Sequence, residues 1–278
     1  GAADGLRRLV GHYRADTAAA LLEVDHSRRL TRIVTPGAGP GRRWPDWLAR
    51  LFFSSRMLAA GWRMLHASAV AIDRSALVFV AGQHGGKSTL AHRACIELGA
   101  CFMADDLLLL GPDGVVAGGP TRIGLPAELA GPGMTGQEEH QVEAGVERRR
   151  LLLTPREHRA VVDHAPPLRL GAVVQVTSAA EQCDGPGTVV QAAPLDEAEL
   201  EAVVARAADV PAQRLYSSDL LGLAGGPPPG RFDRPTHGWE TVLAGVPAVR
   251  LTVRHLRELP RAPVWEALSA WLPGVIAR

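Results

Sequence analysis

The stretch Gly82-Gln83-His84-Gly85-Gly86-Lys87-Ser88-Thr89 places three glycines, a lysine and two hydroxyl side chains within eight positions. This pattern is typical of a turn whose backbone N–H groups surround nucleotide phosphates, with a lysine ammonium on the outer phosphates and a serine hydroxyl on Mg²⁺. Lys87 is the only lysine among the 30 lysine and arginine residues. Since the planar arginine fork is too large and rigid for such a turn, a lysine kept here favours phosphate binding.

The turn departs from the common pattern GxxxxGK[ST]. Counting back from Lys87 puts Ala81 at the position of the first glycine, and if Gly82 takes that part the loop is one residue shorter. This difference predicts a tighter turn or a weakened nucleotide site. The alternative is a glycine turn with a structural role only.

The residues on either side of the turn predict alternating strands and helices. A strand over 66–72, a turn at 73–75 and a strand over 76–81 lead into the glycines, and apolar positions over 88–98 predict a helix that ends at Gly99. A short apolar strand over 100–104 then runs into Asp105-Asp106. Strand, glycine turn, helix, strand and acidic pair follow in the order that a phosphate-binding α/β core requires.

Asp105 and Asp106 are the second candidate feature. Two adjacent carboxylates after a buried strand are costly unless they face a cation or a proton donor, which a metal–nucleotide complex supplies. One carboxylate would hold Mg²⁺ and the other would accept the proton of an attacking hydroxyl. The alternative is an exposed turn that caps a following helix.

The rest of the chain is interpreted more coarsely. Residues 1–44 predict a small β-rich lead-in, with strands near 19–24 and 30–34, and residues 45–278 predict the main domain, which starts with an amphipathic helix over 45–62. Further predicted strands cover 115–117, 172–177, 188–192 and 249–253, and further helices cover 196–208, 213–223 and 264–272. A loop is expected at 225–230.

Composition excludes several classes of protein. The formal charge of +1 and the dispersed arginines, with no run longer than Arg148-Arg149-Arg150, argue against nucleic-acid binding. The apolar stretch 47–65 is interrupted by Arg50, Arg56 and Arg63 and is not a membrane span. Three cysteines without paired spacing indicate a reducing, cytoplasmic compartment, and the ten histidines show no transition-metal pattern.

Taken together, four motifs resemble the HPr kinase/phosphorylase-like kinases, most of all the stand-alone members such as lasso-peptide precursor kinases. The motifs are Leu65-His66-Ala67-Ser68-Ala69-Val70, Phe79-Val80-Ala81-Gly82, Gly85-Gly86-Lys87-Ser88-Thr89-Leu90-Ala91, and Gly99 with Ala104-Asp105-Asp106. The resemblance covers roughly residues 60–126. It implies a phosphate-loop α/β core related to phosphoenolpyruvate carboxykinase, and transfer of a nucleotide γ-phosphate to a serine hydroxyl of a protein or peptide.

The resemblance also implies roles for single residues. His66 would lie near the phosphates and the acidic pair, Asp105 would be the general base, and Asp106 would be the metal partner beside Ser88. From its spacing alone, the default for His66 is a structural histidine. The HPr enzymes have His-Gly where this chain has His66-Ala67, and a longer loop, which argues against the reverse phosphorylase reaction and against HPr as substrate. An oligomer is compatible with the resemblance. From its spacing alone, Arg122 is a further candidate, as a clamp on substrate or transition state; the default for this residue is a surface arginine.

The leading hypothesis is therefore an ATP/Mg²⁺-dependent kinase acting on a serine-type hydroxyl of a peptide or protein, most plausibly in natural-product biosynthesis. A kinase of a small-molecule hydroxyl and a non-catalytic nucleotide-binding regulatory module are the two alternatives. The acceptor and the preferred nucleotide are not specified by the sequence.

Overall fold

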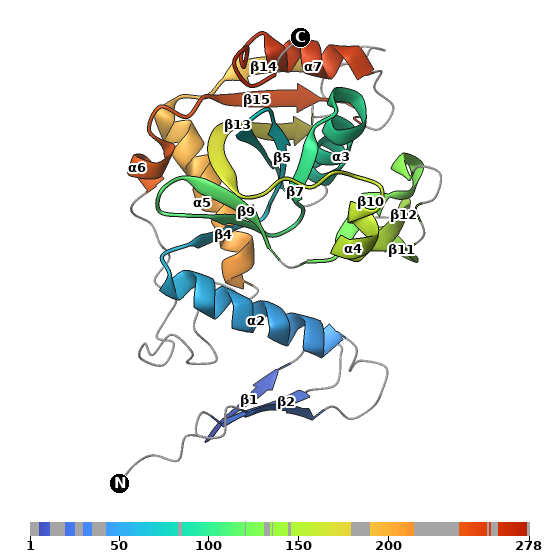
Figure 1. The fold of residues 1–278 in the computed structure, drawn as a ribbon, viewed down its shortest axis with the longest axis vertical. Helices are drawn as coiled ribbons and strands as arrows, with labels where there is room; N and C mark the ends of the chain where they lie inside the picture. The colour runs from blue at the N-terminus through green and yellow to red at the C-terminus, as the bar shows by residue number, and fades with distance from the viewer. Residues whose placement is uncertain are drawn as a thin grey trace. The chain divides into compact units, whose positions relative to one another are not determined.

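The structure is a computed structural model that describes residues 6–11, 20–25, 30–34, 43–82, 85–119, 121–130, 134, 136–143, 146–178, 190–213, 239–254, 256 and 261–276 (Figure 1). Its contacts divide the chain into two compact units, Gly1–Ala60 with Leu215–Phe232, and Gly61–Arg214 with Asp233–Arg278. The predicted helix over 213–223 and the predicted loop at 225–230 lie outside the described residues, except for Gln213, which ends a helix that starts at Glu197. None of the described helices is long and apolar enough to cross a membrane.

The first unit contains an antiparallel sheet of three strands in the order β1-β2-β3. Glu23 on the middle strand pairs with Arg8 and Arg32 on its two neighbours, while Leu22 and Val24 are buried. The helix that was predicted over 45–62 spans 43–59. The elements of this unit are β1 (Leu6–Gly11), β2 (Ala20–Asp25), β3 (Leu30–Val34) and α2 (Arg43–Ala59).

The second unit is built on a mixed sheet, which confirms the predicted α/β class. Among the described residues, nine strands join in the order β4-β8-β9-β13-β6-β5-β7, with β15 beside β13 and β14 beside β15. The strands are β4 (Arg63–Leu65), β5 (Ala67–Ile72), β6 (Ser75–Val80), β7 (Cys101–Ala104), β8 (Leu108–Leu110), β9 (Val115–Gly118), β13 (Leu168–Ser178), β14 (Val190–Pro194) and β15 (Ala248–Val253).

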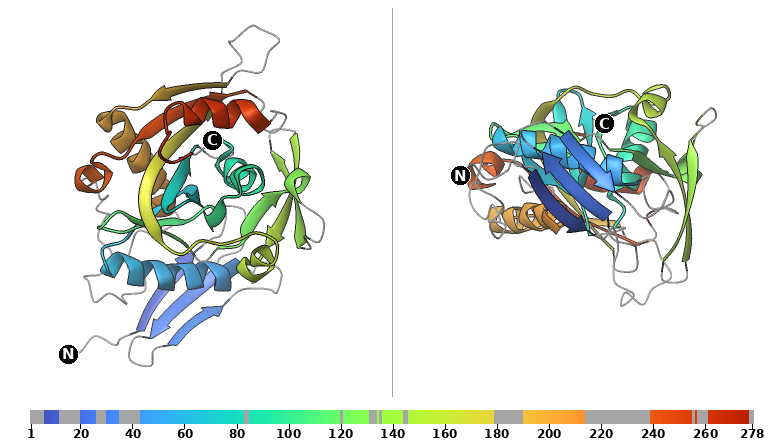
Figure 2. Two further views of the ribbon diagram at one scale, coloured as in Figure 1. Left: turned by 45° about the horizontal axis from the view of Figure 1, so that its top comes forward. Right: turned by 90° about the horizontal axis from the view of Figure 1, so that it is seen from below.

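Strand β13 is the longest strand of this sheet and organises it. It runs parallel to β6 on one side and to β15 on the other, and its first two residues pair antiparallel with β9. A register shift between Leu170 and Ala172 interrupts the pairing with β6, and β13 is visibly curved (Figure 2). Such irregularities bend a strand and increase its twist.

Helices cover this sheet, and alternate side chains of its central strands belong to two separate clusters because successive strand residues point to opposite faces. Val70, Phe79 and Val174 pack with α3 (Lys87–Leu98) and α7 (Arg261–Ser269). Ala69, Val78 and Val173 pack in the other cluster with α5 (Glu197–Gln213) and α6 (Trp239–Leu243). The helix that follows the glycine turn is therefore held by the core.

A smaller antiparallel sheet, in the order β10-β12-β11, belongs to the same unit. Leu125, Leu151 and Leu153 form its buried cluster. Its elements are β10 (Ile123–Pro126), the short 3₁₀ helix η1 (Ala127–Leu129), β11 (Gln137–Glu143), β12 (Val146–Leu153) and the following helix α4 (Pro155–Arg159). Strand β10 contacts α3, so this sheet borders the element that carries Lys87.

Candidate functional site

Three of the motifs predicted to act together lie at one edge of the large sheet. Strand β5 is antiparallel to both β6 and β7, with Ala67 opposite Val80 and Ala69 opposite Ala104. The start of β5 therefore lies beside the ends of β6 and β7. This register brings His66, the glycine turn and the acidic pair to the same edge. In open α/β sheets, ligands bind outside the carboxyl ends of the strands, and β6 and β7 both end here.

The glycine turn has geometry that side chains would disrupt. Gly86 caps α3 with φ of 92°, and a Cβ there would overlap the Leu256 side chain. At Gly85 a Cβ would lie 2.7 Å from the Ala81 Cβ, a separation that needs a backbone shift. A Cβ at Gly82 would meet open space. The two glycines next to Lys87 are thus required by the turn itself; the predicted Gln83 and His84 lie outside the described residues.

The first turn of α3 is arranged for an anion. Gly86 offers no side-chain cap, and no acidic residue stands in the first turn. Backbone N–H groups at the start of a helix lack partners within the helix and carry the positive end of its dipole. A phosphate is a natural partner for such a helix start.

Lys87, Ser88 and Thr89 open this helix. Lys87 and Thr89 are each 7% exposed, and Ser88 is half-buried. The Ser88 carbonyl accepts a hydrogen bond from His92 Nδ1 at 2.8 Å, once the proton is assigned to that nitrogen. Lys87 and Ser88, which are predicted to hold phosphate and Mg²⁺, therefore belong to a helix turn that is partly buried and hydrogen-bonded to the His92 ring.

The two carboxylates differ in their surroundings. Asp105 is 5% exposed, and its Oδ1 accepts the Ser68 hydroxyl at 2.8 Å while its Oδ2 accepts the Gly124 N–H at 3.4 Å. Asp106 has a 36% exposed side chain and a left-handed backbone with φ of 65°. The two side chains are thus held differently, with Asp105 fixed inside the fold and Asp106 facing its surface.

His66 joins this group through its ring. Its Nε2 lies 3.1 Å from Asp106 Oδ1, and its side chain is 6% exposed. Its backbone N–H donates to the Ala207 carbonyl in α5, so His66 stands at a bend between β4 and β5 and does not begin the strand. The structure therefore brings His66 and Asp106 together.

Arg122 is exposed, and its guanidinium donates to Gln137 Oε1 at 3.4 Å, on the neighbouring small sheet. Its part in catalysis stays a prediction. Residues that the sequence interpretation missed are Ser68, Gly124 and Thr121, whose hydroxyl donates to the Asp105 carbonyl at 2.9 Å. A serine in the otherwise apolar stretch 67–72 was a usable signal, because buried polar groups require partners.

Comparisons with known proteins leave the family of the chain undetermined. No protein-family model matches the chain, and no curated protein matches it. A solved structure to which it is similar is the Hpr(Ser) kinase/phosphatase from Coxiella burnetii, at 12% identity and a TM-score of 0.26, covering 48% of this chain and 78% of that chain. At this level the likeness assigns neither family nor activity. Function is therefore argued from the residues of the site.

The donor set fits a magnesium ion that is shared with a nucleotide. Within the described part of the chain, no cluster of three or more His, Cys, Asp or Glu side chains could hold a metal ion. Magnesium is usually held by one or two protein oxygens together with substrate phosphates and water. The Ser88 hydroxyl and the Asp106 carboxylate are oxygens of this kind, at the edge where the phosphates are expected.

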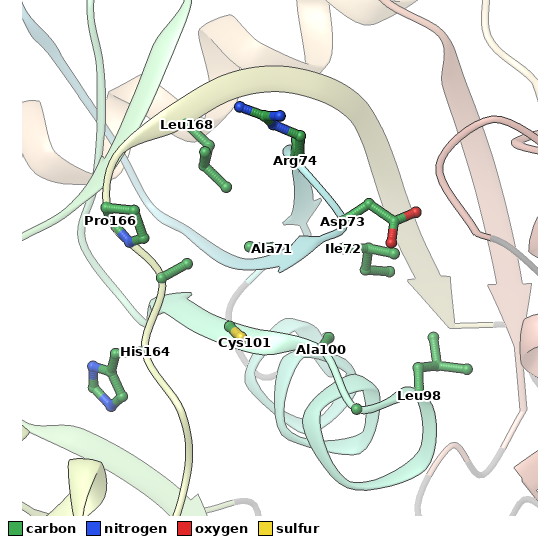
Figure 3. A pocket seen from close by; sticks show the side chains of 12 residues that line it. Ala71, Ile72, Asp73, Arg74, Leu98, Ala100, Cys101, His164, Pro166 and Leu168 are labelled. Atoms are coloured by element: carbon green, nitrogen blue, oxygen red, sulfur yellow. The ribbon is translucent and has the colours of Figure 1, made fainter.

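A cavity of about 330 Å³ lies away from this edge. It is lined by the β5–β6 turn at Asp73 and Arg74, by the end of α3 at Leu98, and by Cys101 and His164 (Figure 3). Since the β5–β6 turn is at the end of these strands opposite to His66 and Val80, the cavity is at the opposite edge of the sheet. It is separate from the predicted phosphate site.

Proposed function

We propose that this chain is an ATP- and Mg²⁺-dependent phosphotransferase that moves the γ-phosphoryl group to a serine-type hydroxyl of a peptide or protein. The observation that carries the proposal is the register of β5 between β6 and β7. It gathers a glycine turn, a helix start with Lys87 and Ser88, an acidic pair and a histidine at one edge.

Binding of the nucleotide falls to the turn and to α3. The backbone N–H groups of the first turn and the Lys87 ammonium meet the phosphate oxygens, and their positive charge offsets the charge that builds up as the phosphoryl group departs. Ser88 and Asp106 would hold Mg²⁺, which would supply further neutralisation of this charge.

Transfer itself needs only one proton acceptor. The acceptor hydroxyl oxygen forms a bond to the γ-phosphorus, the bond from that phosphorus to the bridging oxygen of ADP breaks, and the hydroxyl proton passes to the Asp105 carboxylate. Asp105 keeps acceptor capacity for this proton, since an ionised carboxylate has about four acceptor positions and two are used, by Ser68 and Gly124. Its fixed orientation favours positioning of the hydroxyl.

The acceptor class is supported by the sequence motifs around His66, Lys87 and Asp105, which resemble peptide-modifying kinases. A serine of a precursor peptide in natural-product biosynthesis is the acceptor that we propose, in the cytoplasm.

The test is mass spectrometry of candidate precursor peptides after incubation with the protein, ATP and Mg²⁺. We expect a gain of one phosphate on a serine, no gain with Lys87→Ala, and no gain with Asp105→Asn. ATP affinity should stay within a few-fold of wild type in Asp105→Asn, because that carboxylate acts on the acceptor. Equal loss of ATP binding in this variant would contradict the base assignment. If no peptide is modified while ATP still binds, the peptide acceptor is wrong and the small-molecule or regulatory function replaces it.

A further inference from the structure

Three histidines form a hydrogen-bonded chain behind the candidate site, and two of them, His92 and His158, are buried. His92 lies on α3, His158 on α4, and His164 in the segment before β13. His92 Nε2 lies 3.2 Å from His158 Nε2, and His158 Nδ1 lies 2.7 Å from His164 Nε2. Their rings surround Phe102, with centroids 4.5 to 5.4 Å from its ring. We call these three residues the histidine chain.

One arrangement of protons satisfies every nitrogen in the histidine chain. The Ser88 carbonyl only accepts, so His92 Nδ1 carries the proton and its Nε2 accepts. His158 Nε2 must then donate and its Nδ1 accept, so that His164 Nε2 donates. The Nδ1 of His164 accepts from Arg159 Nε at 3.4 Å.

This arrangement requires three neutral rings, because a second proton on any of them would place two donors face to face. Burial lowers the pKa of His158 to about 3, and burial also lowers the pKa of His164. Burial also lowers the pKa of His92, against a smaller opposite effect of the Asp105 charge. The Arg159 charge lowers the pKa of His164, and the Asp163 charge raises it. The three rings of the histidine chain are thus neutral, and each ring donates its N–H to the next acceptor in the direction of the Ser88 carbonyl.

The histidine chain reaches the candidate site at His92, which bonds the Ser88 carbonyl. Ser88 lies one turn before His92 in the first turn of α3, where the helix meets the expected phosphates. The ring of His92 is 1% exposed, so it cannot turn away without losing its packing against Phe102. His158 fixes the tautomer of His92, because its donor requires an unprotonated His92 Nε2.

The geometry points to His92 as a positioning residue that holds the first turn of α3, and with it the Ser88 hydroxyl, in the orientation that Mg²⁺-bound ATP requires. This inference rests on the proposed function, because it takes Ser88 as a magnesium ligand. His92 acts through Ser88 and has no contact with the nucleotide in this scheme. His158 and His164 act one step further out, by holding His92 in one tautomer.

The test compares ATP affinity with Mg²⁺ and with EDTA, using ATP itself as the probe. In wild type we expect Mg²⁺ to tighten ATP binding. His92→Leu should lose roughly tenfold of this gain, as expected for one lost hydrogen bond to the magnesium-holding turn, and Ser88→Ala serves as the reference for complete loss. His92→Asn should keep most of the gain, since its amide nitrogen takes the place of Nδ1 and can donate to the Ser88 carbonyl.

Val203→Ala is the matched control, since Val203 lies on α5 and its truncation creates a cavity in the core cluster on the face of the sheet opposite to α3. A purely structural role predicts that His92→Leu and Val203→Ala lower the melting temperature and both keep the full Mg²⁺ gain. That result would overturn the positioning role and leave the proposed function intact. Wild-type protein that binds ATP with no Mg²⁺ gain also overturns it. Absence of ATP binding to wild type under both conditions refutes the proposed function together with it.

A second measurement needs no variant. Long-range ¹H–¹⁵N spectra of the wild-type histidines at neutral pH should show the Nδ1–H tautomer for His92 and the Nε2–H tautomer for His158 and His164. An Nε2–H tautomer of His92 would contradict the inference, even if every substitution in the histidine chain prevented folding.

Discussion

Ser68 connects the candidate base, Asp105, to strand β5 through a hydrogen bond. It is fully buried in β5, and its hydroxyl donates to Asp105 Oδ1, which belongs to a residue 37 positions later. Without this donor, the Gly124 N–H is the remaining hydrogen-bond donor to the carboxylate in the described part of the chain. A hydrogen bond to an ionised group contributes more than one between neutral groups. Ser68 is therefore expected to set the orientation of Asp105.

We predict that Ser68→Ala lowers kcat for phosphoryl transfer by roughly 10- to 100-fold, the usual effect of misplacing a catalytic group, and leaves KM for ATP within a few-fold. Steady-state kinetics on the peptide acceptor measures both constants. Ser55→Ala is the control, since it removes a buried hydroxyl that has no hydrogen-bond partner in the described structure. A KM effect as large as the kcat effect would show that Ser68 acts on nucleotide binding instead.

At the scale of single residues, the sequence predicted what local spacing can reveal. Lys87, Ser88 and the acidic pair follow one another along the chain, so their order alone indicated a common site. Ser68, Gly124 and His158 contribute through strand register and helix packing, which join residues distant in the sequence. Such contacts depend on which strands become neighbours, and periodicity does not specify this.

The C-terminal half of helix α3 contains an ion pair between Arg93 and Glu97. Arg93 bonds Glu97 through two nitrogens, at 2.9 and 3.2 Å, and donates to the Leu256 carbonyl. Trp265 on α7 donates its indole N–H to Glu97 at 2.6 Å. The side chains of Arg93 and Glu97 are only 5% and 9% exposed, so the ion pair is almost fully buried. Each residue also has a hydrogen-bond partner outside the pair, the Leu256 carbonyl for Arg93 and the Trp265 indole for Glu97. Glu97 thus joins the helix after the glycine turn to the C-terminal helix.

We predict that Glu97→Ala lowers the free energy of unfolding by about 3 kcal/mol, because it removes one partner of a nearly buried ion pair. Chemical denaturation measures this change. Glu266→Ala is the matched control, as it removes a carboxylate from the exposed side of α7. A change below about 1 kcal/mol would mean that the Arg93–Glu97 pair behaves like a surface ion pair.

At the scale of elements, the predictions succeeded where hydrophobic patterns were regular. The strands around the glycine turn and the helix after it were found close to their predicted limits. Strands β8 and β10–β12 were not predicted, since the run Leu107–Leu110 and the charged run in β12 alternate in no clear period. Helix α5 continues to Gln213, past the predicted end at 208, although Pro211 lacks the N–H that would bond the Ala207 carbonyl. That carbonyl accepts the His66 N–H instead.

The stability of the second unit should depend on pH through its buried histidines. The pKa of His158 is about 3 in the folded protein because of burial, against 6.5 ordinarily. Between these values the unfolded chain binds a proton that the folded chain does not. Stability therefore falls as pH drops below 6.5, and it is insensitive to this group above pH 7.

We predict that the melting temperature of the protein declines steadily from pH 7 to pH 5, and that His158→Gln flattens this decline. His140→Gln, which changes an exposed histidine on β11, should leave the slope unchanged. A slope that is the same in all three proteins would show that His158 is protonated in the folded state or that other groups dominate.

Two units account for the described chain, and the candidate site lies wholly within the second. The sequence indicated a change of character near the helix over 45–62, because the composition shifts from short alternating runs to buried strands. It gave no signal that residues 215–232 group with the first unit, because such grouping depends on long-range contacts. The predicted boundary after residue 44 stays a prediction.

The close approach of Leu256 to Gly86 has a consequence for the order of events during protein synthesis. Strand β15, Leu256 and α7 complete the core face on which α3 packs, and they leave the ribosome long after the glycine turn itself. A nascent chain that ends before residue 248 has the residues for phosphate binding without the packing that shapes their turn. ATP is thus expected to bind only once the C-terminal elements have folded, so the nucleotide cannot assist the earlier stages of folding.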